Sequence, residues 1–116
     1  MDIYHIWCAL KDGVGDMEFA DNVSEYLGHL EDEGHIEGWR LTRRKLGLGP
    51  DDLPEFHIMV EVSGLAQLDD AFGRAAARAE PVEGLHHAVN RLVSKVKFAL
   101  YRDFPDPGRK TGEERF

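Results

Sequence analysis

Histidine is the residue of this chain best suited to move protons near neutral pH, and the chain has six of them. His5 and His57 lie in segments whose side chains alternate as in β-strands, whereas His86 lies in a segment with helical spacing. A positioned imidazole can act as a general acid or base. We therefore take His5, His57 and His86 as candidate catalytic residues.

The spacing of these residues argues against a metal site. His57 and Glu61 share one face of a strand, but four residues span about 13 Å at the rise of a strand. His86 and His87 on a helix point about 100° apart and would not normally chelate one ion. The chain contains no His-x-x-Glu-His or Cys-x-x-Cys pattern. We expect neither a bound metal nor another cofactor.

His86 and Asn90 share a helix face, because residues four apart on a helix are neighbours. Two interpretations stay open for this pair. The side chains either project into a cavity between helix and sheet, with His86 as an acid/base group, or they form a polar flank of the helix.

The elements that must position these residues follow from the spacing of apolar side chains. Four segments alternate as strands and three show helical spacing: residues 2–10, 36–46, 56–62 and 94–104, and residues 16–34, 64–79 and 81–93. Asp16 is a suitable helix N-cap, and Gly34 is placed to end the first helix in a left-handed cap.

The order strand, helix, strand, strand, helix, short helix, strand predicts an α+β, ferredoxin-like βαββαβ fold. Its four-stranded antiparallel sheet has the order 4-1-3-2, with the helices on one face. The second strand then lies at the sheet edge, where a basic run can guard the exposed backbone or, alternatively, bind an anion. That run is Arg40, Arg43, Arg44 and Lys45.

Alternation along the third strand assigns its two faces. Phe56, Ile58, Val60 and Val62 face the helices, which leaves His57, Met59 and Glu61 on the open face. By the same logic His5 and Trp7 of the first strand join the open face. The register stays open: His5 opposite His57 would let the two share a substrate or metal, whereas Trp7 opposite His57 would make a stacking contact.

Bulky side chains on both faces of the first strand indicate that both faces of the sheet are covered, one of them by a second subunit, a ligand or both.

The length of 116 residues suits one domain, expected at residues 1–104, followed by a tail at 105–116 docked on the domain or its partner. A net charge of −8 disfavours nucleic acid and anionic membranes. Cys8 has no intrachain partner, and without a signal segment the expected location is the cytoplasm.

Three segments carry a resemblance to a known superfamily: Tyr4-His5-Ile6, the run from Phe56 to Val62, and the run from Phe98 to Phe104. With this topology the chain resembles the dimeric α+β barrel superfamily, nearest to uncharacterised bacterial domain-of-unknown-function proteins. The resemblance implies that two sheets pack face to face in a homodimer. Some cyclase-like members carry histidines on the first and third strands, as His5 and His57 do here, although the run after His57 is one residue longer.

The superfamily includes cofactor-independent monooxygenases and proteins without known activity, so the resemblance is compatible with two functions for this chain. In the first, the chain binds or converts a small aromatic or polyketide-like molecule without an organic cofactor, using histidine acid/base chemistry. Its candidate substrate-binding residues are Trp7, Trp39, Met59 and Tyr101. In the second, the chain is a structural or interaction dimer whose histidines line the interface.

Overall fold

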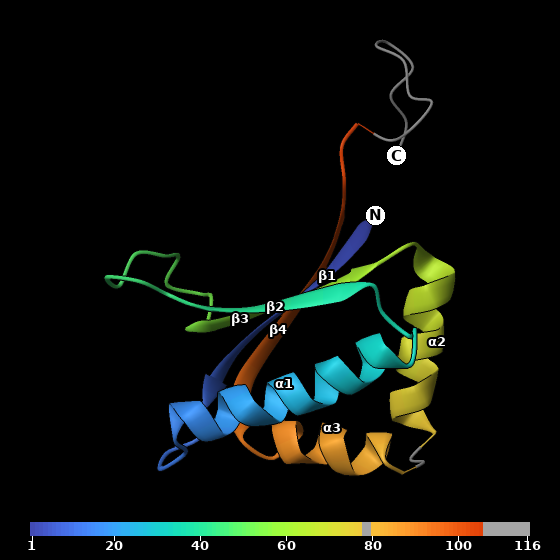
Figure 1. Ribbon diagram of the computed structural model, residues 1–116. Helices are drawn as coiled ribbons and strands as arrows, with labels where there is room; N and C mark the ends of the chain where they lie inside the picture. Colours follow the sequence, from blue (N-terminus) through green and yellow to red (C-terminus); the bar gives the residue numbers. More distant parts are fainter. Residues whose placement is uncertain (78–79, 106–116) are drawn as a thin grey trace.

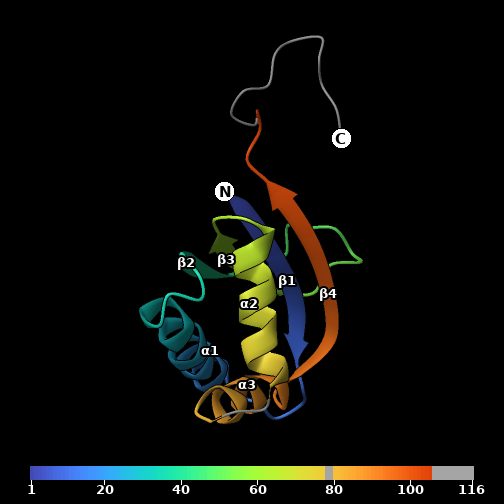
Figure 2. The ribbon, with the colours of Figure 1, turned by 90° about the vertical axis from the view of Figure 1, so that its right-hand side faces the viewer.

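The computed structural model describes residues 1–77 and 80–105 (Figure 1). Within them the elements follow the expected order: β1 (Asp2–Leu10), α1 (Asp16–Asp32), β2 (Gly38–Arg43), β3 (Phe56–Val62), α2 (Leu65–Ala76), α3 (Val82–Asn90) and β4 (Val93–Arg102). The strands form one antiparallel sheet in the order β2-β3-β1-β4, with the helices on one side (Figures 1 and 2). The predicted ferredoxin-like α+β fold and strand order are confirmed.

The core lies between the sheet and α1. Strand β3 alternates as predicted, with Phe56, Ile58, Val60 and Val62 buried against the helices. Helix α1 buries one face through Phe19, Val23, Leu27 and Leu30, which recur at helical spacing. Burying each such side chain contributes about 1.5–3 kcal/mol to the stability of the fold, so the packing of α1 fixes its position against the sheet.

The start of α1 differs from the expectation. Asp16 is the first helical residue, and Gly15 occupies the N-cap position. The Asp16 carboxylate instead pairs with Arg43 Nη1 at 3.0 Å, which ties the helix to the edge strand. At the other end Gly34 adopts φ +78°, as predicted, and its N–H donates to the Glu31 carbonyl.

Helix α2 buries only Leu68 and Ala71, while Leu65 and Phe72 of its apolar stripe stay exposed. The helix stands at one end of the sheet rather than beneath its centre (Figure 1). Strand β4 therefore lacks a full helical cover, and Phe98 and Leu100 remain exposed on its helix-facing side. The apolar spacing of residues 64–79 thus predicts the helix but not how much of its apolar stripe is buried.

A β-bulge bends β4. The pairing of β1 with β4 shifts between Trp7 and Ala9, because Trp7 lies opposite Lys97 and Ala9 opposite Ser94. Lys95, with φ +53°, is in the extra segment. Beyond the bulge Phe98 and Leu100 face the helices, and Figure 2 shows the curvature of the strand.

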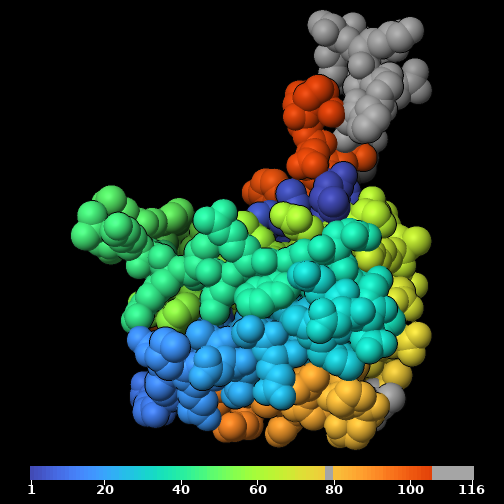
Figure 3. Space-filling view, in the orientation of Figure 1, coloured from blue at the N-terminus to red at the C-terminus, as the bar shows by residue number. Residues whose placement is uncertain are grey.

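The basic run at the sheet edge has structural partners. Arg43 pairs with Asp16 and Glu55, and Arg44 donates hydrogen bonds to the carbonyls of Pro50 and Leu53. Arg44 thereby organises the long β2–β3 loop, which projects from the body of the molecule (Figure 3). Two of the four basic residues are thus engaged in intrachain contacts.

Residues 106–116 lie outside the described part of the chain, as does Ala79 at the predicted end of the second helix. The expectation that the tail docks on the domain or its partner falls on those residues. Among the described helices, none has the length and apolar character that crossing a membrane requires.

Candidate functional site

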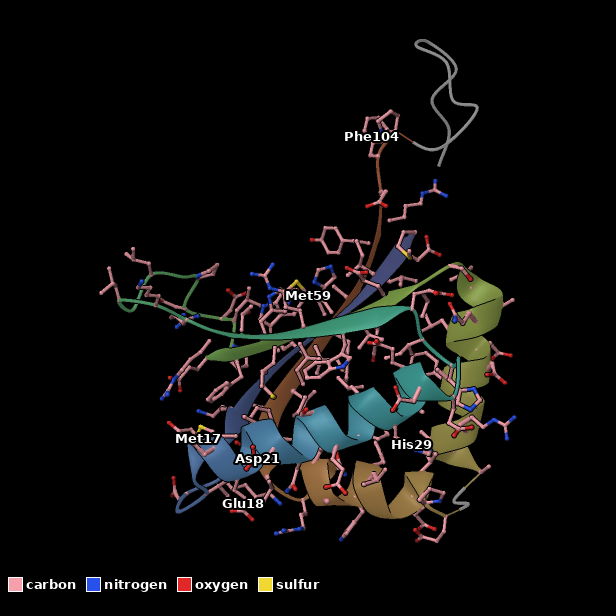
Figure 4. All side chains as sticks on the ribbon, viewed as in Figure 1. Met17, Glu18, Asp21, His29, Met59 and Phe104 are labelled. Carbon is pink, nitrogen blue, oxygen red and sulfur yellow. The ribbon has the colours of Figure 1, made fainter. Side chains whose placement is uncertain are left out.

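An aromatic and imidazole cluster occupies the open face of the sheet. We define the open-face cluster as His5, Trp7, His57 and Tyr101. Trp7 lies opposite His57 across β1 and β3, and His5 lies opposite Met59. Figure 4 shows Met59 on the side of the sheet away from the helices. Of the two registers that the sequence left open, the structure has the one in which Trp7 lies opposite His57.

Three rings of the cluster, those of His5, Trp7 and His57, stack nearly parallel to one another. The Trp7 and His57 ring centroids lie 4.5 Å apart at 11°, and those of His5 and Trp7 lie 5.5 Å apart at 12°. Tyr101 meets the His5 ring edge-on, with centroids 4.9 Å apart. These are the offset and T-shaped arrangements that aromatic rings prefer.

The two imidazoles also contact each other directly, because diagonal neighbours on a sheet face are within reach of long side chains. His5 Nδ1 lies 2.8 Å from His57 Nε2, so one ring donates an N–H to the other. Desolvation lowers the pKa of His5, and desolvation together with the charge of His5 lowers the pKa of His57. Both rings are therefore neutral at pH 7.

A pocket opens on the other side of the sheet, between the helices and β4. We call it the inner pocket; its volume is about 140 Å³. Its walls come from β1, β3, β4, α1 and α3 and are mainly apolar: Ile6, Cys8, Val23, Leu27, Ile58, Val89, Val93, Val96 and Phe98. Asn22 Nδ2 donates to the Ala88 carbonyl at 3.3 Å and joins the two helices of the wall.

Three polar side chains complete the inner pocket: Tyr26, His86 and Asn90. The Tyr26 and His86 rings lie 5.5 Å apart. Desolvation raises the pKa of Tyr26, so its hydroxyl stays protonated and able to donate. Desolvation, and then the charge of His87, lower the pKa of His86. A neutral imidazole and a phenol thus face an apolar space, an arrangement that can accept and return a proton.

His86 and Asn90 also border a second hollow, which we call the outer hollow, with a volume of about 520 Å³. Glu83, His87 and two alanines of α2 form the rest of its lining. His86 is exposed on this side, so its ring lies between the inner pocket and solvent. The cavity interpretation of the His86 and Asn90 pair therefore has a geometric basis.

The structure separates the predicted site residues into two groups. His5, Trp7, His57, Met59 and Tyr101 lie on the open face. His86 lines the inner pocket on the helix side and does not join them.

Trp39 lies opposite Val60 on the helix-facing side, where it packs against the core. It therefore belongs to neither group. The sequence did not reveal the direction of Trp39, because the side chains of β2 alternate only weakly. Tyr26 is the pocket residue that the sequence did not single out; its place beside Leu27 on the apolar stripe of α1 was the available signal.

The buried thiol of the inner pocket is not a nucleophile. Cys8 is 1 % exposed, and desolvation raises its pKa to about 11. A thiol with so high a pKa holds almost no thiolate at neutral pH. Among the described residues there is also no group of three or more His, Cys, Asp and Glu side chains suited to hold a metal ion.

Comparisons with known proteins address the fold. The family described as a family of unknown function (DUF6614) matches residues 1–116. No curated protein matches the chain.

Several solved structures share the architecture. A dimeric ferredoxin-like protein of unknown function from Jannaschia sp. CCS1 has a TM-score of 0.63 at 13 % identity, over 89 % of this chain and 100 % of that one. A mutant of SnoaB, a cofactor-independent oxygenase from Streptomyces nogalater, has 0.62 at 13 %, over 93 % and 97 %. The hydroxynitrile lyase from Passiflora edulis has 0.63 at 15 %, over 91 % and 97 %. At such identities the likeness shows the fold alone.

Proposed function

This chain belongs to the family of unknown function DUF6614, and we propose that it binds and converts a small organic molecule in the inner pocket, without an organic cofactor. His86 is the proton-transfer group, and Tyr26 and Asn90 orient the substrate by hydrogen bonds. The observation that carries the proposal is a mainly apolar pocket bordered by three polar side chains, two of them with displaced pKa values.

The size of the pocket limits the substrate class. An apolar protein cavity of about 150 Å³ accepts benzene. The inner pocket, at about 140 Å³, therefore suits a single aromatic ring or a group of that size. A ring inserted there presents its polar substituent to His86, Tyr26 or Asn90, which lie at one side of the space.

Proton transfer is the reaction class that these residues support. A neutral His86 accepts a proton from the substrate, and its exposure toward the outer hollow lets the proton exchange with water. The protonated phenol of Tyr26 donates a hydrogen bond to an oxygen that gains charge. Two proteins of the same fold, an oxygenase described as cofactor-independent and a hydroxynitrile lyase, are in keeping with such chemistry.

The test compares two adjacent histidines. His86→Gln keeps a hydrogen-bonding group but removes the proton acceptor, whereas His87→Gln changes a residue outside the inner pocket. Single-ring aromatic compounds are screened by ligand-observed NMR, and hits are assayed for turnover. We expect His86→Gln to lower the rate by about 10²- to 10⁴-fold, whereas His87→Gln should change it much less, through the effect of the His87 charge on the pKa of His86. Equal rates in both variants would remove His86 from the mechanism.

A second, non-enzymatic role is favoured by other residues. We propose that the open face forms a homodimer interface lined by His5, Trp7, His57 and Met59. Aromatic residues and Met are enriched at the cores of interfaces. The structure from Jannaschia sp. CCS1 is described as dimeric, which supports the proposal. A single domain at residues 1–104 and a cytoplasmic location, in keeping with the free thiol of Cys8, remain part of the proposal.

Native mass spectrometry tests the dimer independently of the inner pocket. A dimer with no affinity for any aromatic compound would favour the interaction role. A monomer that binds and converts such compounds would favour the enzyme and remove the interface.

A further inference from the structure

The His5 and His57 pair lies on the two inner strands of the face that the proposed dimer covers. Strands β1 and β3 are the inner strands of the sheet, and His5 lies near the middle of β1. In a two-fold dimer the same patch of both protomers forms the interface, and its centre is the most fully desolvated part. The hydrogen-bonded imidazoles are therefore placed where an added charge is least tolerated.

The charges around the pair are mainly positive. Arg40 of β2 lies opposite Met59 on the open face, and Lys97 of β4 lies opposite Trp7. Arg44 follows β2, and its guanidinium is held by the β2–β3 loop. Two carboxylates belong to the surroundings of the pair. Glu61 of β3 lies four residues beyond His57 and about 13 Å away, and Glu55 lines a hollow with Trp7 and His57 but is paired with Arg43 Nε at 2.6 Å. β1 contributes no charged side chain to this face.

Among the described residues, the hydrogen-bond and ring partners of the two imidazoles are each other, Trp7 and Tyr101. A proton added to the pair therefore meets cations on neighbouring strands and no carboxylate within ion-pairing distance. Burial under a second protomer removes the water that would otherwise solvate the charge. The protonated pair is thus compatible with a solvent-exposed face and poorly compatible with a covered one.

We propose that the open face is a proton-controlled self-association surface: uptake of one proton by the His5 and His57 pair of each protomer dissociates the homodimer. The inference rests on the proposed homodimer and names its regulation. The partner is a second copy of this chain. Because the neutral pair is the associating form, the dimer is tightest above neutral pH and weakens as the solution becomes acidic.

Linkage gives the size of the effect. Dissociation of one dimer takes up two protons, one for each protomer, so the dissociation constant varies with the square of the proton concentration. In the pH range where the pair titrates, the dissociation constant then rises by up to about 100-fold for each unit of pH. Uptake of a single proton per dimer would give about tenfold.

Sedimentation equilibrium of the full chain between about pH 5 and pH 8 measures this slope, since histidine titrates there. The comparison includes the double variant His5→Gln, His57→Gln, which retains hydrogen bonding but does not titrate, and His87→Gln on helix α3 as the control. We expect the wild type and the control to show the steep slope and the double variant a dissociation constant independent of pH. A flat dissociation constant in the wild type, or an equal slope in the double variant, would overturn the inference.

A second measurement keeps the test decisive if the double variant does not associate. The imidazole signals of His5 and His57 in the wild type are followed by NMR over the same pH series. Titration of these signals together with dissociation supports the inference, and titration at a pH where the dimer stays intact refutes it. A wild type that is monomeric even at pH 8 would instead contradict the homodimer itself.

Discussion

The two tryptophans of this chain offer a matched test of which sheet face associates, because they lie on opposite faces. Trp7 stacks on His57 and His5 on the open face, with ring centroids 4.5 and 5.5 Å apart. Trp39 packs against the core on the helix-facing side. The substitutions Trp7→Ala and Trp39→Ala remove the same side chain and should therefore have different effects.

The magnitudes follow from these contacts. Trp7→Ala loses two ring pairs, which lowers the free energy of unfolding of the protomer by about 1–3 kcal/mol. At a central hot spot of an interface, truncation costs about 2 kcal/mol or more. A two-fold dimer loses two copies of the side chain, so its dissociation constant should rise by about a thousandfold.

Trp39→Ala should lower the stability of the protomer and leave association intact. Complete burial of a Trp would make the cost about 3–5 kcal/mol, and the half-buried Trp39 should cost less. Urea unfolding measures the stability of each variant, and sedimentation equilibrium under folding conditions measures its dissociation constant. An unchanged dissociation constant for Trp7→Ala, or an equal rise for Trp39→Ala, would refute the assignment of the open face as the interface.

Other predictions address the core, the thiol and the histidines. Phe19→Ala, at a fully buried ring, should lower the free energy of unfolding by about 3–5 kcal/mol in urea melts, and a change below about 1 kcal/mol would contradict the packing described. Cys8 should resist iodoacetamide at neutral pH in the folded protein and react after unfolding, since its pKa is raised to about 11; rapid labelling of the native state would refute its burial. Folding lowers the pKa values of His5, His57 and His86 below the ordinary 6.5, so the unfolded chain binds more protons than the folded one. The free energy of unfolding should therefore fall as the pH decreases through about 6.5. Urea melts that show this free energy rising over the same range would contradict the directions of the pKa shifts.

The face assignments of β1 and β3 could be predicted because alternation with a period of two is a local property of the sequence. The register of β1 against β3 could not, since it depends on how the chain between the two strands, through α1 and β2, returns to the sheet. The sequence left a choice between a shared site of His5 and His57 and a stack of Trp7 on His57. Both contacts occur, because His57 lies opposite Trp7 and still reaches His5 diagonally.

The inner pocket was harder to predict than the cluster. Its lining comes from five elements, and no local pattern connects Tyr26 of α1 with His86 of α3. The direction of Trp39 was also hidden, because β2 alternates weakly between Gly38 and Thr42. Helical spacing correctly placed His86 and Asn90 on one face, but only tertiary packing shows that a cavity lies beside that face.

Methyl-resolved NMR of the full chain during titration with a single-ring aromatic compound tests the central claim most directly. The claim predicts that the methyl signals of Leu27, Ile58 and Val89 shift together, while those of Val62 and Leu68, which do not line the inner pocket, stay in place. If compounds of this size bind and shift only methyl groups of the open face, such as those of Ile3, or shift none of the pocket signals at millimolar concentration, the inner pocket is not the binding site.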